Sequence, residues 1–271
     1  MKMLILRIAS AAIGIVYLIL AFYIGGWFLD LSVLGISLIG MHEFYTAVRH
    51  RGYNPLSWVG YLFIFSLFWS IALHLSYFHA ILLSALLAAF FCLFLTVVSQ
   101  RLNLLDACLT IFGCIYPGMA FMSLILLYDA EIYGKYLLIF TLFATWATDT
   151  FAYFTGLGLG KNRLCPRVSP KKTVEGSIGG VLGSLVTGIL VGMVFTRFYK
   201  LEIGYLHYAI ISLLCGITSQ MGDLSASSIK RFCNIKDFGR ILPGHGGILD
   251  RFDSILFTVP VVYSYYLLFL S

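Results

Sequence analysis

Nine long runs of apolar residues, separated by short polar loops, constrain the fold of this 271-residue chain more than any other feature. The runs lie at about 8–28, 31–48, 57–75, 78–98, 105–128, 136–159, 177–198, 206–228 and 252–270. A helix needs roughly 20 apolar residues to cross the hydrocarbon core of a bilayer, whereas membrane strands give short alternating segments. Only 11% of the chain is charged, against about a quarter in a soluble domain. The sequence therefore predicts an all-α, polytopic integral membrane protein with about nine transmembrane helices.

The distribution of basic residues predicts how these helices are oriented. With nine spans, only Lys135, Arg197 and Lys200 of the 18 Lys and Arg residues fall on the side opposite the N-terminus. Basic residues concentrate in cytoplasmic loops, so we expect a cytoplasmic N-terminus and an external C-terminus. The two longest polar loops, 160–176 and 229–251, then share the cytoplasmic face. The residues that give the net charge of +6 lie mainly in such loops. This placement indicates a role in membrane orientation and in binding phosphate groups, and not in binding nucleic acid.

The chain reads as one membrane unit with two regions of different character. Residues 1–130 carry little polar detail and are interpreted as a helical scaffold, whereas residues 131–271 hold the candidate catalytic region. Within the second region, small residues recur every four positions: Gly176, Gly180, Ser184, Gly188 and Gly192. This spacing favours close packing of one helix on another, and a mobile helix is the alternative interpretation.

Three acidic residues stand out within apolar runs, where a carboxylate normally has a partner or a function. Asp223 has the strongest case for function, because its helix leads directly into a polar loop. Asp149 could pair with a neighbouring helix or belong to the site. Glu43 is expected to be a surface-proximal or ion-paired carboxylate.

The loop after Asp223 combines carboxylates with basic residues. Asp250 and Asp253 are three positions apart, so on a helix they face the same way, near an N-terminus that favours negative charge. Together with Asp223 they form a candidate all-oxygen site, and Mg²⁺ suits a few carboxylates plus waters and substrate phosphates. Lys230 and Arg231 supply positive charge for phosphate oxygens.

The remainder of this loop, including Lys236 and a glycine-rich turn at 243–247, permits close approach of backbone to a ligand. A basic loop that only meets anionic lipid is the competing interpretation. It does not explain two carboxylates at a helix start.

The second polar loop contains the sequence Ser169-Pro-Lys-Lys-Thr173. Lys171, Lys172, the two hydroxyls and the adjoining helix N-terminus form a candidate phosphate cradle, although a positive-inside loop without a ligand is also open. The preceding glycines at 156–160 do not form a P-loop. That motif needs Gly at Thr155 and Ser or Thr at Asn162, and it follows a strand.

The stretch from Ser227 to Asp253 resembles the signature of the phosphatidate cytidylyltransferase (CDP-diacylglycerol synthase) family. The matching positions are Ser227, Lys230-Arg231, Lys236-Asp237, Gly239, Pro243, His245-Gly-Gly247, Asp250-Arg251 and Asp253. Ser169–Thr173 and Asp149 with Ala152-Tyr-Phe154 resemble the same family. The resemblance implies transfer of CMP from CTP to phosphatidic acid, with CDP-diacylglycerol and pyrophosphate as products and with dependence on Mg²⁺. Two cations are expected, because a pair can stabilise both the incoming and the leaving oxygen.

Combining the residues with the resemblance gives a set of candidate site residues. The catalytic candidates are Asp223, Lys230, Arg231, Asp250 and Asp253, with the three aspartates as metal ligands. The substrate-binding candidates are Ser169, Lys171, Lys172, Thr173, Lys236, Asp237, His245, Arg251 and Asp149. The expected partners are CTP, phosphatidic acid and membrane lipids, without nucleic acid, and a homodimer is left open. The expected location is the cell inner membrane or its equivalent, with the site facing the cytoplasm.

Two other functions compete with this interpretation. A CTP-dependent lipid kinase, or a cytidylyltransferase for another membrane lipid, is the nearest enzymatic alternative. An ion-coupled transporter is the alternative of another class, but transporters commonly show paired repeats with broken helices, which this sequence lacks.

Overall fold

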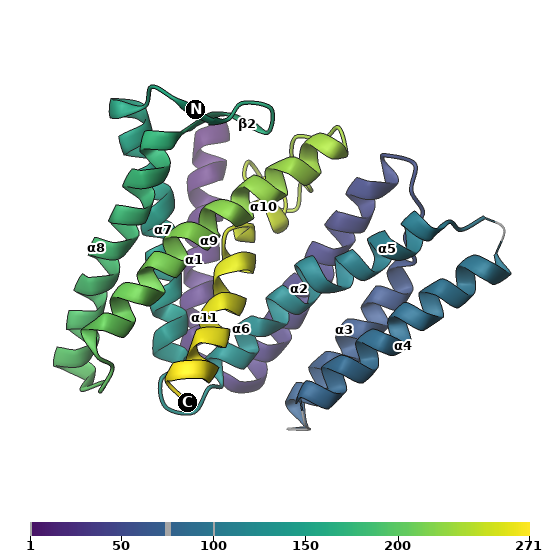
Figure 1. Ribbon diagram of the computed structural model, residues 1–271, viewed down its shortest axis with the longest axis horizontal. Helices are drawn as coiled ribbons and strands as arrows, with labels where there is room; N and C mark the ends of the chain where they lie inside the picture. Colours follow the sequence, from purple (N-terminus) through teal and green to yellow (C-terminus); the bar gives the residue numbers. More distant parts are fainter. Residues whose placement is uncertain (1, 74–76, 100) are drawn as a thin grey trace. The chain divides into compact units, whose positions relative to one another are not determined.

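The computed structural model describes residues 2–73, 77–99 and 101–271. Its elements are α1 (Lys2–Ile24), α2 (Gly26–Arg49), α3 (Ser57–Ala72), α4 (Tyr77–Val98), α5 (Leu104–Gly113), the π-helical turn η1 (Cys114–Met119), α6 (Ala120–Tyr128), α7 (Gly134–Leu159), β1 (Arg163–Cys165), β2 (Ser169–Thr173), α8 (Val174–Tyr199), α9 (Tyr205–Phe232), α10 (Leu249–Phe252) and α11 (Ile255–Phe269) (Figure 1). The predicted helical class is confirmed, with one short hairpin added to it.

Six of the described helical segments are long and apolar enough to cross a membrane: Gly26–Arg49, Ile81–Val98, Leu104–Tyr128, Gly134–Leu159, Val174–Tyr199 and Tyr205–Phe232. Three shorter apolar helices are Ala12–Ile24, Ser57–Ala72 and Ile255–Phe269. The predicted boundary between the first two runs, at 28–31, is wrong, because the backbone breaks at Gly25 with φ of 62°. The predicted end of the third run, at residue 75, lies outside the described residues.

Internal packing divides the chain into two units. Unit 1 contains Met1–Ile125 and Lys230–Arg251, and unit 2 contains Leu126–Ile229 and Phe252–Ser271. The expected division of the chain at residue 130 stays a prediction. The loop at 230–251 belongs to the same unit as the N-terminal helices.

A buried tyrosine joins three helices of unit 1. Tyr45 of α2 is fully buried, and its hydroxyl donates to the carbonyl of Thr110 in α5 at 2.9 Å. Gly60 of α3 and Gly113 of α5 both lie against this ring, where a Cβ atom would overlap it. Helix α5 continues directly into the π-helical turn η1, which contains Pro117. Proline cannot donate the ordinary helical hydrogen bond, and this favours a local widening of the helix.

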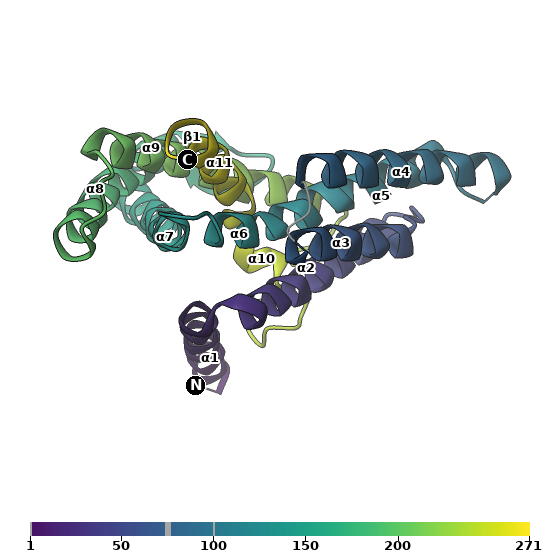
Figure 2. The same ribbon diagram turned by 90° about the horizontal axis from the view of Figure 1, so that it is seen from below.

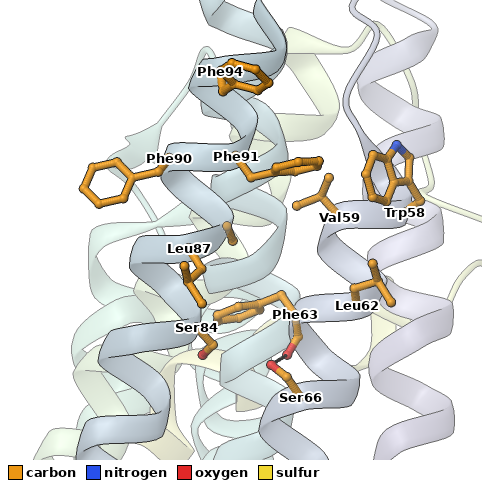
Figure 3. Close-up of a pocket in the computed structure, with 11 residues that line it drawn as sticks. Trp58, Val59, Leu62, Phe63, Ser66, Ser84, Leu87, Phe90, Phe91 and Phe94 are labelled. Atoms are coloured by element: carbon orange, nitrogen blue, oxygen red, sulfur yellow. Dashed lines mark hydrogen bonds between the residues drawn. The ribbon is translucent and has the colours of Figure 1, made fainter.

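Helices α3 and α4 of unit 1 lie side by side in both views (Figures 1 and 2). An apolar groove of about 630 Å³ lies between them, with Trp58, Leu62 and Phe63 of α3 on one wall (Figure 3). Phe91 and Phe94 of α4 are on the other wall, and the rings of Trp58 and Phe91 meet edge to face at 5.5 Å. The groove is thus an aromatic and aliphatic surface.

Helices α7 and α8 of unit 2 pack closely along their length (Figure 1). The predicted stripe of small residues on α8 forms this contact and also packs against α9. A Cβ atom at Gly180 would lie 2.9 Å from the carbonyl oxygen of Thr148, and Ser184 donates to the carbonyl of Ser212 at 2.8 Å. Close packing is therefore confirmed as the role of this stripe.

This packing predicts a position-dependent effect of side-chain size. The substitution Gly180→Val should lower the free energy of unfolding by about 1–3 kcal/mol relative to Gly158→Val, because overpacking forces helices apart. Gly158 is a matched control on α7, where a Cβ atom would meet nothing within 4 Å. Thermal unfolding of the purified variants in detergent measures the difference, and equal stabilities would contradict the packing role.

Candidate active site

A buried ion pair forms the centre of the polar loop in unit 1. Lys230, near the end of α9, places its Nζ atom 2.7 Å from Oδ1 of Asp250 in α10. The other oxygen, Oδ2, accepts from the backbone N–H groups of Phe238 at 2.8 Å and Gly247 at 3.0 Å. The Asp250 side chain is only 2% exposed, and the Lys230 ammonium lies over the Phe238 ring. Asp250 therefore organises the loop through three contacts, with the Lys230 ammonium and the N–H groups of Phe238 and Gly247.

The glycine-rich turn closes on this carboxylate. Gly244 and Gly246 have φ of 76° and 87°, which L-residues rarely adopt. The N–H of Leu242 donates to the carbonyl of Gly246 at 3.0 Å. A Cβ atom at Gly246 would lie 2.9 Å from Oδ2 of Asp250. The close backbone approach predicted for this turn is thus made to a carboxylate of the protein itself.

His245 of the same turn contacts α1. Its Nδ1 atom lies 2.8 Å from the hydroxyl of Ser10, which also donates to the carbonyl of Pro243 at 3.1 Å. The imidazole is half-buried. This arrangement ties the turn to the first helix of unit 1.

Glu43 of α2 holds the other side of the turn. Its carboxylate is buried and accepts from the N–H groups of Ile248 at 3.0 Å and Leu249 at 2.9 Å. The expectation of a surface-proximal or ion-paired carboxylate is wrong, since backbone amides solvate this group. The candidate set did not include Glu43, although an acid within an apolar run was a usable signal.

A second cluster, in unit 2, brings together three segments distant in sequence. Lys172 of β2 places its Nζ atom 2.5 Å from Oδ2 of Asp223 in α9. Asp149 of α7 lies close enough for the charges of both residues to act on it. The side chains of Lys172 and Asp223 are 27% and 31% exposed, and Asp149 is exposed as well. The cluster holds two carboxylates and one ammonium group and is open to a ligand.

Ser227 and Asp253 lie around this cluster in unit 2. The Ser227 hydroxyl lies one helical turn from Asp223 and donates to its Oδ1 at 3.4 Å. Gly222, next to Asp223, packs directly on the backbone of Asp253, and Oδ1 of Asp253 accepts from the Ser254 N–H at 2.8 Å. Asp253 therefore lies beside the helix that carries Asp223.

The loop before α8 is an antiparallel hairpin of β1 and β2, with Arg163 opposite Thr173. Thr173 caps α8 by accepting from the Gly176 N–H at 3.1 Å, and the Val174 N–H donates to Asn162. Glu175 accepts from the backbone of Lys161 and from Asn162. These first amides of α8 have partners within the protein, so a phosphate here would depend on the side chains of Lys171 and Lys172. The excluded P-loop segment ends helix α7 and follows no strand.

The predicted metal ligands are divided between the units. Asp250 belongs to unit 1, whereas Asp223 and Asp253 belong to unit 2. Within neither unit do three or more of the described His, Cys, Asp and Glu side chains form a metal-binding group. Asp149 and Asp223 still offer the one or two carboxylates that Mg²⁺ takes alongside waters and substrate phosphates. The donor chemistry of this pair fits Mg²⁺.

The other candidate residues lie at the surface of their units. Arg231, Lys236, Asp237 and Arg251 are exposed in unit 1, and Lys171 is exposed and Ser169 half-buried in unit 2. These side chains are accessible to a ligand.

The apolar groove between α3 and α4 does not suit a nucleotide. Its hydroxyls belong to Ser66 and Ser84, which donate to the carbonyls of Phe63 at 2.7 Å and Ile81 at 3.2 Å in their own helices. A site for a charged nucleotide needs placed polar groups. The two charged clusters are therefore the candidates for nucleotide binding.

Comparison with known proteins identifies the family of this chain. The model of a family described as the cytidylyltransferase family matches residues 5–269. The "Phosphatidate cytidylyltransferase" of Bacillus subtilis (strain 168) is 43% identical over 157 residues, which cover 58% of this chain but only 57% of that protein. The protein of the same name from Staphylococcus saprophyticus is 41% identical, over 66% of each chain. The one from Synechocystis sp. is 34% identical, over 97% of each chain.

Proposed function

Because the chain belongs to the cytidylyltransferase family, we propose that it transfers CMP from CTP to phosphatidic acid, forming CDP-diacylglycerol and pyrophosphate. The observation that carries this proposal is the cluster of Asp149, Lys172 and Asp223. It gathers charged groups from two helices, α7 and α9, and from strand β2 of an integral membrane protein. The relatives compared above are named for the same reaction.

The proposed reaction breaks and makes one phosphorus–oxygen bond. A phosphate oxygen of phosphatidic acid attacks the α-phosphorus of CTP, and the bond from that phosphorus to the bridging oxygen breaks, so pyrophosphate leaves with the bond electrons. The nucleophile is already anionic, so no general base is required. Such transfers depend on positioning and charge neutralisation. Lys171 and Lys172 supply positive charge in unit 2, and Lys230 and Arg231 supply it in unit 1.

The carboxylates are proposed to bind Mg²⁺. Asp223, with Asp149 beside it, is the first choice for a ligand, and Asp250 and Asp253 stay predicted ligands, with two cations as the expected number. When bound, such cations neutralise the charge of the nucleotide phosphates. Lys172, which pairs with Asp223, then turns its ammonium group to a phosphate oxygen.

The proposed topology places the reaction at the cytoplasmic surface. Nine transmembrane helices with a cytoplasmic N-terminus put the loops at 160–176 and 229–251 on that side, where soluble CTP meets a lipid phosphate. The proposal applies to a single chain and equally to a homodimer.

Product analysis tests this function directly. The purified protein in detergent should convert CTP and phosphatidic acid into CDP-diacylglycerol and pyrophosphate, with the α-phosphate label of CTP appearing in the lipid. A lipid kinase would instead place the γ-phosphate label in the lipid and release CDP. A transporter would leave CTP unchanged. Either result would refute the proposal.

A further inference from the structure

Glu43 contacts the loop of unit 1 from a helix that lies about two hundred residues earlier in the chain. Its Oε1 and Oε2 atoms accept from the N–H groups of Ile248 and Leu249, the two residues that precede Asp250. The Glu43 residue is 3% exposed. A carboxylate removed from water in this way depends on the loop amides for its solvation, and those amides depend on the carboxylate.

Two glycines of the loop make room for the same carboxylate. A Cβ atom at Gly247 would lie 2.5 Å from both carboxylate oxygens, and one at Gly239 would overlap Oε1. Gly239 follows Phe238, whose N–H donates to Asp250, and the Gly247 N–H donates to Asp250 as well. The two loop segments that hold Asp250 are therefore the segments that close around Glu43.

We propose that Glu43 is a positioning residue for the reaction: it fixes the loop so that Asp250 and Lys230 keep their mutual geometry. The inference rests on the proposed function, because the geometry of this pair matters for turnover only if the loop serves cytidylyl transfer. Glu43 itself is enclosed by the protein and acts through Asp250. With Glu43, the functional residues include a member of the N-terminal region, which is interpreted from its sequence as a helical scaffold.

The substitution Glu43→Gln is the sharpest perturbation of this clamp. Glutamine keeps the length of the side chain, but its NH₂ group must face one of the two backbone N–H donors, since an amide offers only one acceptor oxygen. We expect kcat to fall by about tenfold to a hundredfold, the range that a small misplacement of reacting groups produces. The KM for phosphatidic acid should stay within about twofold, because Glu43 is enclosed by the protein and is not available to a substrate.

Asp106→Asn provides a matched control in the same unit. Asp106 is 1% exposed and also accepts from two backbone N–H groups, those of Asn54 at 2.7 Å and Asn103 at 3.0 Å. It therefore reproduces the loss of a buried carboxylate without touching the loop at 230–251. This variant should keep the kcat of the wild-type protein even where its thermal midpoint falls as far as that of Glu43→Gln.

Hydrogen–deuterium exchange separates this inference from the proposed function. In Glu43→Gln, peptides covering residues 238–250 should exchange faster than in the wild-type protein and in Asp106→Asn, whether or not the reaction is the one proposed. Unchanged exchange would overturn the clamp, and faster exchange with wild-type kcat would overturn its role in positioning. A wild-type protein that makes no CDP-diacylglycerol, but shows the exchange difference, would refute the proposed function while supporting the clamp.

Discussion

Replacing Asp223 with asparagine should lower kcat for CDP-diacylglycerol formation by about 10²- to 10³-fold, the effect of removing one charged or dipolar group that stabilises a transition state. The substitution preserves shape but removes the negative charge that pairs with Lys172 at 2.5 Å. It also leaves Asp149 as the single carboxylate of the cluster. Both the proposed cation site and the orientation of the Lys172 ammonium depend on that charge.

The measurement is the initial rate of lipid labelling at saturating CTP and phosphatidic acid. Glu202→Gln is the control, because Glu202 is an exposed acid of unit 2 in the connection between α8 and α9. The control should keep the wild-type rate. Since Asp223 is partly exposed, both variants should unfold at nearly the wild-type temperature. An Asp223→Asn protein with a rate within twofold of wild type would remove Asp223 from the site.

The helices were predictable because apolar length alone determines where a chain can cross a bilayer. Each of the nine predicted apolar runs overlaps one or more of the described helices, and six of the described segments are long and apolar enough to cross a membrane. The missed break at Gly25 has a physical reason. Gly25 and Gly26 lie inside a continuous apolar run, and their positive φ values of 62° and 49° are conformations that composition does not reveal.

The candidate site was only partly predictable, because its contacts are made over long sequence separations. Asp223 and Lys172 could be proposed from an acid inside a span and a basic loop beside it. The partners of Glu43 lie more than two hundred residues later, so no local pattern identifies them. The hairpin of β1 and β2 was missed because its strands of three and five residues lie at the short end of the usual range, where a regular alternation of residues is hard to detect.

The grouping of the loop at 230–251 with unit 1 also depends on contacts over long sequence separations. In sequence this loop connects α9 to α11, which suggests that it packs on those helices. In the structure its backbone amides bind Glu43, and Leu249 packs on Gly40 of α2. Side chains of the N-terminal region therefore help to determine the conformation of a loop that carries the family signature.

Removing one charge of the buried pair of Lys230 and Asp250 should have the second large effect, which lowers stability as well as activity. Asp250→Asn leaves the Lys230 ammonium, whose side chain is 13% exposed, without its carboxylate. Breaking a buried pair by removing one partner lowers the free energy of unfolding by about 3–5 kcal/mol. We expect a loss in this range, measured by thermal unfolding in detergent, together with a fall in kcat of at least about a hundredfold.

The double variant Lys230→Met with Asp250→Asn separates the two effects. Methionine replaces the unpaired ammonium with an apolar group of similar length, so the double variant should regain part of the lost stability, because replacing both charges of a buried pair is often neutral. Activity should stay at the level of the single variant, since the phosphate-binding charge is also gone. Recovered stability with recovered turnover would show that the pair only supports the fold, and Asp250→Asn with wild-type turnover would exclude Asp250 as a metal ligand.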